Sequence, residues 1–202
     1  MGSRKWVNRT HVILGKGKSR SLPEYQQWTN MRQRCKINGK YQTLNKSYIG
    51  CTHTREWESY DVWLEWAKGQ VGFLCVGSEG NYYSMDKDIL VKGNKVYSPD
   101  TCVFVPAELN TFLLNCKATR GVHPIGVHYR VRNGTSGKFV SQITIGGEGR
   151  KHLGHYETPE AAFQAYKIAK EAYAKVLANK YTGLVDDRVI SALLEYEVNI
   201  ED

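Results

Sequence analysis

The C-terminal third of the sequence contains short segments in which apolar and polar residues alternate. In residues 127–132 (VHYRVR) the apolar members fall on one face and the basic and imidazole side chains on the other, as a half-buried strand requires. Residues 138–145 divide in the same way, and residues 150–156 supply a third strand after a glycine-rich turn. This order predicts a three-stranded antiparallel sheet with one apolar face and one basic face.

A helix is expected to cover the apolar face of this sheet. Thr158 stands at an N-cap position, Pro159 falls in the first turn, and Glu160 lies near the positive end of the helix dipole. Apolar side chains then recur at helical intervals. The predicted apolar stripe consists of Ala162, Tyr166, Ala169, Tyr173 and Val176.

The opposite face of the sheet would be left bare with hydrogen-bonding side chains. Arginine donors match O6 and N7 of guanine, glutamine matches the edge of adenine, and β-sheets are among the elements that read DNA grooves. We therefore expect this face to bind double-stranded DNA. A solvated polar face is the alternative, and RNA is a weaker one, because the face is mostly Arg, Lys and Gln rather than aromatic. The predicted DNA-binding residues are His128, Arg130, Arg132, Lys138, Gln142, Thr144, Arg150 and His152.

The charge of the chain agrees with a polyanionic partner. The formal net charge is +8, and residues 181–202 carry six acids against the single base Arg188. That net −5 leaves +13 on residues 1–180. Phosphate contacts supply most of the sequence-independent affinity for nucleic acid. A basic surface that serves only solubility is the competing explanation.

The first two thirds of the chain are expected to begin with a basic arm and two helices. Residues 1–20 hold six bases and no acid, and glycines interrupt them; such an arm either orders on DNA or stays a flexible terminus. The S-x-x-E spacing at residues 21–24 and the apolar period predict a helix over residues 22–35. A second apolar stripe predicts a helix over residues 54–68, after a polar loop.

Residues 82–116 predict the order strand, turn, strand, helix. A short strand-like pattern covers residues 82–90, and residues 92–95 (KGNK) form a turn. Residues 102–105 are apolar and end at a proline, and residues 107–116 carry an apolar side at helical spacing.

Three segments of the C-terminal part resemble a known DNA-binding domain. They are residues 126–130 (GVHYR), 137–143 (GKFVSQI) and 152–166 (HLGHYETPEAAFQAY). Together they resemble the Apetala-type, ethylene-response-factor domain, over about residues 120–180. In that family three strands lie in the major groove, which implies DNA contacts from the same bare face.

Three positions depart from the plant members of that family. Gln142 stands for their usual Glu, Thr144 for their Arg, and His152 for their Trp. The target sequence of the plant proteins is therefore not carried over to this chain.

Domains of this type outside plants are often joined to HNH nucleases of phages and mobile elements, and the resemblance extends in part to that pattern. Residues 85–88 (MDKD) stand where HNH proteins have Asp-His, and residues 98–102 (SPDTC) resemble their middle segment. Asn110 stands on the helix where a metal-binding Asn or His is expected. Residues 28–35 match the W-x-x-M-x-x-R-C run of related phage proteins.

The HNH reaction needs a divalent cation held by oxygen ligands and a base that activates water. The resemblance implies Asp86 and Asn110 as ligands of Mg²⁺ or Mn²⁺. Lys87 replaces the expected histidine, and a free lysine, with a pKa of about 10.4, is protonated at neutral pH. A nearby cation would lower that pKa, which leaves Lys87 open as a base or as a phosphate contact. Asp88 is a second catalytic candidate, and His53, near the second predicted helix, is a more distant one. The competing interpretation is that Asp86, Lys87 and Asp88 form only a solvated turn with local ion pairs.

The sequence thus predicts an α+β protein whose N-terminal helices and small ββα-metal-like (HNH-like) module precede a three-stranded antiparallel sheet packed on one helix. The expected parts are the basic arm over 1–20, the helical region and module over 21–118, and the Apetala-type domain over 120–182. An acidic segment over 183–202 either packs as a short helix or caps the basic surface. The predicted function is site-selective binding of duplex DNA with metal-dependent, homing-endonuclease-like cleavage. The alternative is a non-catalytic, sequence-specific regulator that keeps the module as a scaffold.

Cysteine usage and hydropathy suggest where such a chain works. The five cysteines are an odd number without CxxC spacing, which favours free thiols in a reducing compartment. No run of about 18 apolar residues and no apolar signal core occur, so we expect no membrane partner. The resemblance implies the cytoplasm of a bacterial host of a phage or mobile element. The sequence leaves the oligomeric state open.

Overall fold

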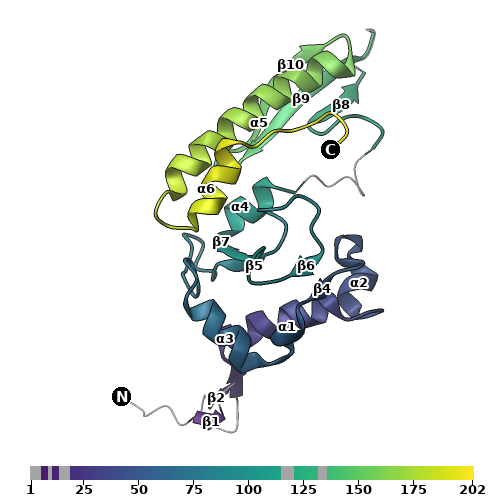
Figure 1. Cartoon of the computed structure of the whole chain (residues 1–202). Helices are drawn as coiled ribbons and strands as arrows, with labels where there is room; N and C mark the ends of the chain where they lie inside the picture. The colour runs from purple at the N-terminus through teal and green to yellow at the C-terminus, as the bar shows by residue number, and fades with distance from the viewer. Residues whose placement is uncertain (1–5, 9–10, 14–18, 115–120, 132–135) are drawn as a thin grey trace. The chain divides into compact units, whose positions relative to one another are not determined.

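The computed structural model describes the backbone of residues 6–8, 11–13, 19–114, 121–131 and 136–202, and side chains from residue 22 onward. The chain divides into two compact units, residues 1–107 and 108–202. Each unit mixes helices with strands (Figure 1), which confirms the α+β class. No helix in these ranges combines the length and the apolar character needed to cross a membrane.

The first unit begins with a small antiparallel sheet. Strands β1 (Trp6–Asn8), β2 (His11–Ile13) and β3 (Ser19–Ser21) pair in the order β1-β2-β3. The sequence pattern did not predict these strands, and the glycines expected to interrupt the arm, Gly15 and Gly17, lie outside the described residues.

Helix α1 (Pro23–Cys35) matches the predicted helix closely. Its N-cap is Leu22, whose side chain makes no capping bond, so the expected capping box does not start the helix. Pro23 suits the first turn because its missing N–H would have no partner there. Met31 and Trp28 are buried, and the Trp28 indole donates a 2.9 Å hydrogen bond to the carbonyl of Trp57. These aromatic residues serve packing.

The second predicted helix is broken into two pieces. A 3₁₀ turn, η2 (Arg55–Glu58), is followed by helix α3 (Tyr60–Lys68). Ser59 separates them in an extended conformation, and its hydroxyl accepts a hydrogen bond from the backbone N–H of Val62. A serine that caps a new helix competes with continuation of the old one.

The segment expected to be a polar loop contains helix α2 (Lys40–Leu44) and the 3₁₀ turn η1 (Lys46–Tyr48). It leads into β4 (Thr52–His53), which pairs in parallel with β6 (Val96–Tyr97). Sequence periodicity missed both strands, because two residues are too few to show alternation.

A second strand pair contains the predicted Asp-Lys-Asp segment. Strand β5 (Ser84–Asp86) pairs antiparallel with β7 (Val103–Val105), and helix α4 (Ala107–Phe112) follows in the sequence. The expected order of strand, strand and helix is present, with β5 shorter than predicted. A ββα-metal arrangement of these elements remains a prediction.

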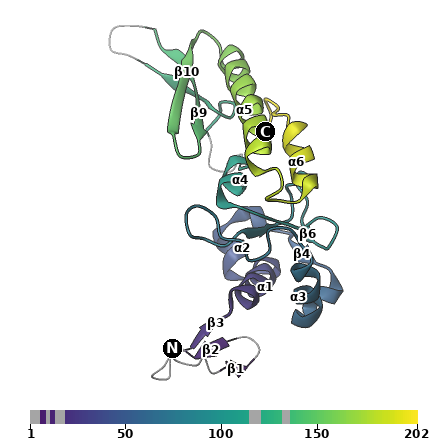
Figure 2. The same ribbon diagram turned by 90° about the vertical axis from the view of Figure 1, so that its left-hand side faces the viewer.

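The second unit contains the predicted three-stranded antiparallel sheet. Strands β8 (Val127–Arg130), β9 (Lys138–Ile145) and β10 (Gly149–Tyr156) lie in the order β10-β9-β8. Helix α5 (Pro159–Tyr181) runs along one face of the sheet (Figure 2), and Thr158 caps it by accepting a hydrogen bond from the N–H of Ala161. The prediction of a sheet packed on one helix is confirmed.

The core between the sheet and α5 is apolar. It consists of Ile125, Val127, Ile143, Ala162, Phe163, Tyr166 and Val198. Gly126 has a φ of +77°, and a Cβ atom there would lie 2.0 Å from the Tyr166 ring, so only glycine lets this ring reach the sheet. Val176 does not belong to the buried stripe as predicted; it is exposed.

The acidic C-terminal segment packs as a short helix, one of its two expected forms. Helix α6 (Asp187–Leu194) lies beside α5 and buries Val189 and Leu193. Its N-cap, Asp186, accepts a hydrogen bond from the N–H of Arg188 and forms an ion pair with that guanidinium.

Within the second unit α4 is fastened to α5 by Glu108. Its carboxylate accepts hydrogen bonds from the hydroxyls of Tyr173 (2.9 Å) and Tyr181 (2.5 Å) and from the ammonium of Lys180 (2.5 Å). The Tyr173 hydroxyl also accepts from the N–H of Gly146, in the turn between β9 and β10. One carboxylate thus connects α4, α5 and the sheet.

Candidate nucleic-acid interface

The strand register places the predicted DNA-binding side chains on one face, which we call the outer face. Alternate residues of the central strand β9 share a face, and Ile143 and Val127 belong to the core on the other side. The cross-strand rows of the outer face are Thr144 with Arg150, Gln142 with His152, Val140 with His128 and His155, and Lys138 with Arg130.

The side chains of this face differ in exposure. Arg130, Thr144, Arg150 and His152 are exposed, whereas His128, Lys138 and Gln142 are half-buried. In Figure 2 α5 lies along one side of β9 and β10; the outer face is the other side, because the core residues Val127 and Ile143 pack together with residues of α5. Arg132, the remaining predicted residue, lies outside the described residues. The structure therefore brings the other predicted residues together on one surface.

A β-bulge adds His155 to the outer face. The pairing register of β10 shifts between His152 and Gly154, and His155 then pairs with Val140. The imidazole rings of His152 and His155 lie 4.7 Å apart between centroids. Strict alternation placed His155 on the covered face, so sequence reasoning missed it. Gly154, with a φ of +142°, was the available signal, because an isolated glycine in a strand often marks a bulge.

One cation of the outer face is already paired. The Lys138 ammonium forms an ion pair with the carboxylate of Glu157, just past the end of β10. An exposed pair of this kind is worth only about 0–1 kcal/mol, so a phosphate can displace the carboxylate at low cost. Among the described residues of the face, Arg150 and Arg130 carry exposed guanidinium groups.

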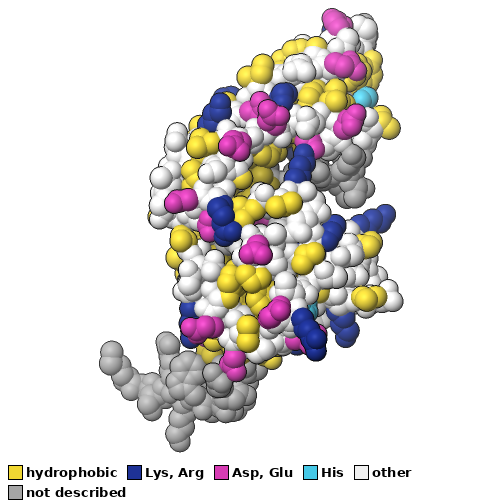
Figure 3. Space-filling view, in the orientation of Figure 1, with side chains coloured by type: hydrophobic (Ala, Val, Ile, Leu, Met, Phe, Trp, Pro, Cys, Tyr) yellow, Lys and Arg dark blue, Asp and Glu magenta, His cyan; other side chains and the backbone are white. Residues whose placement is uncertain are grey.

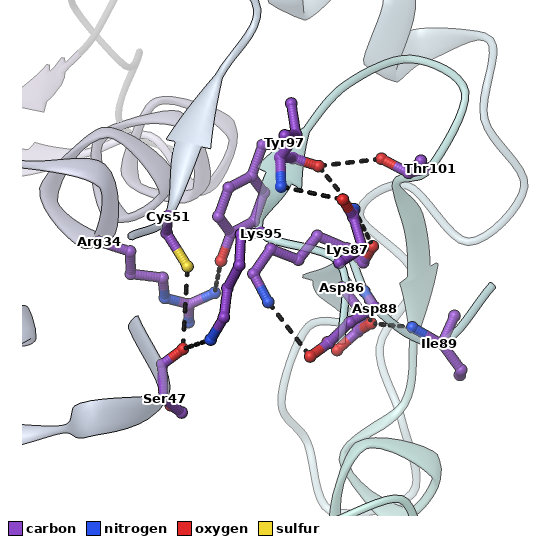
Figure 4. A network of polar contacts seen from close by, with 12 residues as sticks. Arg34, Ser47, Cys51, Asp86, Lys87, Asp88, Ile89, Lys95, Tyr97 and Thr101 are labelled. Atoms are coloured by element: carbon purple, nitrogen blue, oxygen red, sulfur yellow. Dashed lines mark hydrogen bonds and ion pairs between the residues drawn. The ribbon is translucent and has the colours of Figure 1, made fainter. Parts of the chain in front are cut away.

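The Asp-Lys-Asp segment at the end of β5 has a different environment (Figure 4). One carboxylate oxygen of Asp86, Oδ1, accepts hydrogen bonds from the N–H groups of Asp88 (2.9 Å) and Ile89 (2.8 Å). Burial and the neighbouring Asp88 raise the pKa of the Asp86 carboxyl group. Asp86 therefore ends the strand by capping the following turn.

Lys87 points into the first unit. It is only 5% exposed; its ammonium lies 3.2 Å from a carboxylate oxygen of Asp88 and 5.7 Å from the centre of the Tyr97 ring. Figure 4 shows the lysine between Tyr97 and the two aspartates. The hydroxyl of Tyr97 in turn accepts a 3.5 Å hydrogen bond from the guanidinium of Arg34. Lys87 is thus a buried cation with a protein partner.

The donors available for a metal ion are few in the part of the chain that the structure describes. No group of three or more His, Cys, Asp and Glu side chains there is arranged to hold a metal ion. Asp86 and Asn110 belong to different units, each described by itself, so their pairing stays a prediction. His53, the more distant candidate, has its Nδ1 2.9 Å from the carbonyl oxygen of Thr54.

No model of a known protein family matches the chain, and neither a curated protein nor a solved structure is found to be similar to it. The resemblance to the Apetala-type domain and to HNH nucleases therefore rests on the residues of the sequence alone.

Proposed function

We propose that the protein binds double-stranded DNA, with the outer face of β8, β9 and β10 in the major groove. The observation that carries this proposal is the set of hydrogen-bonding side chains that the register gathers on the face opposite to α5. These side chains stand on a rigid sheet, because the apolar core fixes the strands from behind. Preorganised donors lose little entropy when they meet their acceptors.

The dimensions of the outer face agree with this proposal. Neighbouring strands lie about 4.8 Å apart, so the two edge strands are separated by about 10 Å, which is comparable with the groove width of about 12 Å. The six residue steps from Lys138 to Thr144 extend about 20 Å at about 3.4 Å per residue. Gln142 on the central strand is placed to read a base, and Arg130 on an edge strand to meet phosphates.

The test starts by selecting, from random duplexes, those that the full-length chain retains. Titration of the selected duplex at fixed salt should then show that Arg150→Ala and Gln142→Ala each weaken binding by about 1–3 kcal/mol. Lys175→Ala, an exposed lysine on α5, is the matched control and should leave affinity nearly unchanged. Unaltered affinity in both outer-face variants, or retention of RNA in preference to duplex DNA, contradicts the proposal.

Metal-dependent endonuclease activity is a second candidate function. The observation that favours it is the place of two carboxyl groups in one turn, where the Asp88 N–H donates to Asp86 Oδ1; burial, and then the neighbouring Asp88 carboxylate, raise the pKa of Asp86. Such a pair attracts a hard divalent cation. Mg²⁺ or Mn²⁺ held by Asp86 and Asn110 would stabilise the departing oxygen of a phosphodiester. Asp88 is more exposed than Asp86, and its ion pair with Lys87 would hold it in position to accept a proton from water.

The cleavage assay uses a plasmid that carries the selected site, with Mg²⁺ or Mn²⁺. The proposal expects nicking by the wild-type chain and none by Asp86→Ala or Asn110→Ala. Cleavage that both variants retain removes this site assignment. Tight, site-selective binding without any metal-dependent nicking by the wild type supports the non-catalytic regulator instead.

A further inference from the structure

A second surface with an excess of positive charge lies in the first unit, far in sequence from the outer face. Residues 25–55 contain no aspartate or glutamate. Within them Lys36, Lys40 and Lys46 are exposed, around helix α2 and the turn η1. In a chain with 20 acidic residues, an acid-free stretch of this kind concentrates positive charge at one place.

The same segment exposes apolar side chains that folding leaves uncovered. Ile37 is 81% exposed, Leu44 74% and Ile49 56%, and neither α2 nor η1 buries a residue. Single exposed apolar residues are ordinary, but a group of them in one short segment marks an interaction site. Figure 3 shows basic and hydrophobic side chains next to each other over the region that Figure 1 labels α2.

This segment is held in place by the polar network of the first unit (Figure 4). The Lys95 ammonium donates a 2.6 Å hydrogen bond to the carbonyl of Ser47, and the Arg34 guanidinium lies over the Tyr48 ring at 5.2 Å. The Gln42 side chain donates to the carbonyl of Arg34. A helix of five residues is unstable alone, so these contacts supply the rigidity of an otherwise exposed element.

We propose that the α2 surface, defined as Lys36, Ile37, Lys40, Tyr41, Leu44, Lys46 and Ile49, is a second contact with duplex DNA. Its lysines bind backbone phosphates, and its apolar side chains pack into the minor groove against sugars and base edges. Proteins that bind the minor groove combine basic side chains with apolar wedges in this way. The contact does not depend on the outer face, and it adds affinity that is independent of sequence.

A salt titration of the full-length chain with a duplex of arbitrary sequence distinguishes the contribution of the lysines to DNA affinity from that of the apolar side chains. The triple change Lys36→Gln, Lys40→Gln and Lys46→Gln removes up to three phosphate contacts. The slope of log affinity against log salt should therefore become shallower by about 2–3. Ile37→Asn with Leu44→Asn should weaken binding roughly tenfold and leave the slope unchanged, because no charge is removed.

A matched triple of exposed lysines elsewhere, Lys68→Gln, Lys92→Gln and Lys175→Gln, removes the same net charge. It should change the slope by less than about one. Equal slopes for the two triples overturn the proposal, as does unchanged affinity in the apolar pair. So does a third result, in which the α2-surface triple loses binding to vesicles of phosphatidylserine and phosphatidylcholine while its DNA slope stays at the wild-type value. The surface would then belong to a membrane.

Failure of this proposal is distinguishable from failure of the outer-face proposal. Outer-face variants should change the preference between the selected duplex and an arbitrary one. The α2-surface variants should weaken binding to both duplexes by the same factor.

Discussion

The basic side chains at the end of β5 and on the outer face of the sheet have opposite surroundings. Lys87 is almost fully buried and its ammonium pairs with Asp88, whereas Arg130 and Arg150 are exposed. A cation that already has a protein partner contributes to stability. An exposed guanidinium instead releases counterions when it meets a phosphate. The place of a basic residue in the fold, rather than its presence in the sequence, decides which of these it does.

The two regions are also held together differently. An apolar core fixes the strands behind the outer face. The segment after β5 is held largely by side chains that bond to the backbone, since Asp86 accepts from two N–H groups and the Asn94 amide donates to the carbonyls of Lys87 (2.7 Å) and Val96 (2.8 Å). Loss of a single polar group should therefore cost more near β5 than on the outer face.

The largest effect is expected from Lys87→Ala. The change removes a buried cation and the packing of its stem, and leaves Asp86 and Asp88 without their nearest positive charge, so the first unit should lose about 3 kcal/mol of unfolding free energy. All five tryptophans lie in residues 1–107, so urea unfolding followed by tryptophan fluorescence reports on this unit. DNA affinity and its salt slope should stay as in the wild type.

Arg150→Ala, which removes an exposed cation of the outer face, should have the opposite effects and is the control for Lys87→Ala. It should change the unfolding free energy of the second unit, followed by the loss of helical circular dichroism in urea, by less than about 0.5 kcal/mol while it weakens DNA binding. If Lys87→Ala leaves stability unchanged and makes the salt slope shallower by about one, Lys87 is a phosphate contact. The contrast between the two cations would then be wrong.

A smaller effect is expected from Glu108→Gln, and it depends on pH. Burial by itself raises the pKa of Glu108, but hydrogen bonds from Lys180, Tyr181 and Tyr173 outweigh it and hold the pKa below its usual value. A carboxyl group with a lowered pKa stabilises the folded state above its unfolded pKa of about 4.3, and this stability is lost as pH falls through the folded value.

At pH 7 the variant should therefore be about 2 kcal/mol less stable than the wild type, and the gap should narrow toward pH 3. Loss of helical circular dichroism in urea measures it, because α5 and α6 belong to this unit. Glu195→Gln, an exposed carboxyl of the same unit, should show no such gap. A difference between wild type and Glu108→Gln that stays constant from pH 7 to pH 3 would rule out the carboxylate as the source.

Regular local signals explain why the sheet and α5 were predictable. Strand β9 is eight residues long, and its apolar residues Phe139, Ile143 and Ile145 fall at odd positions, while Thr158 with Pro159 marks the start of α5 within a few positions. Each signal is contained in the segment that it specifies, so no knowledge of distant residues is needed. The outer face follows from the same spacing, because a strand with one side against the core turns its other side away from that core.

Other features depend on contacts between distant residues or on a single backbone irregularity. Strands β4 and β6 consist of two residues each, and Thr52 meets Val96 only in the folded chain. The burial of Lys87 depends on Tyr97 and Asp88 enclosing it, which the Asp-Lys-Asp pattern cannot show. The bulge before Gly154 reverses the faces of the residues that follow, so one backbone irregularity decides whether His155 lies on the outer face.

The smallest effect tests that bulge. If His155 lies on the outer face, as its pairing with Val140 indicates, His155→Ala should weaken binding to the selected duplex by about 0.5–1 kcal/mol, the net worth of one hydrogen bond. Lys151, which pairs with Ile143 and so leans toward the covered side, is the matched control in the same strand. Electrostatic attraction alone would make Lys151→Ala the more harmful change, since it removes a full charge. Measured at fixed pH and salt, a larger loss for His155→Ala therefore favours direct contact by the outer face, and a larger loss for Lys151→Ala contradicts the face assignment.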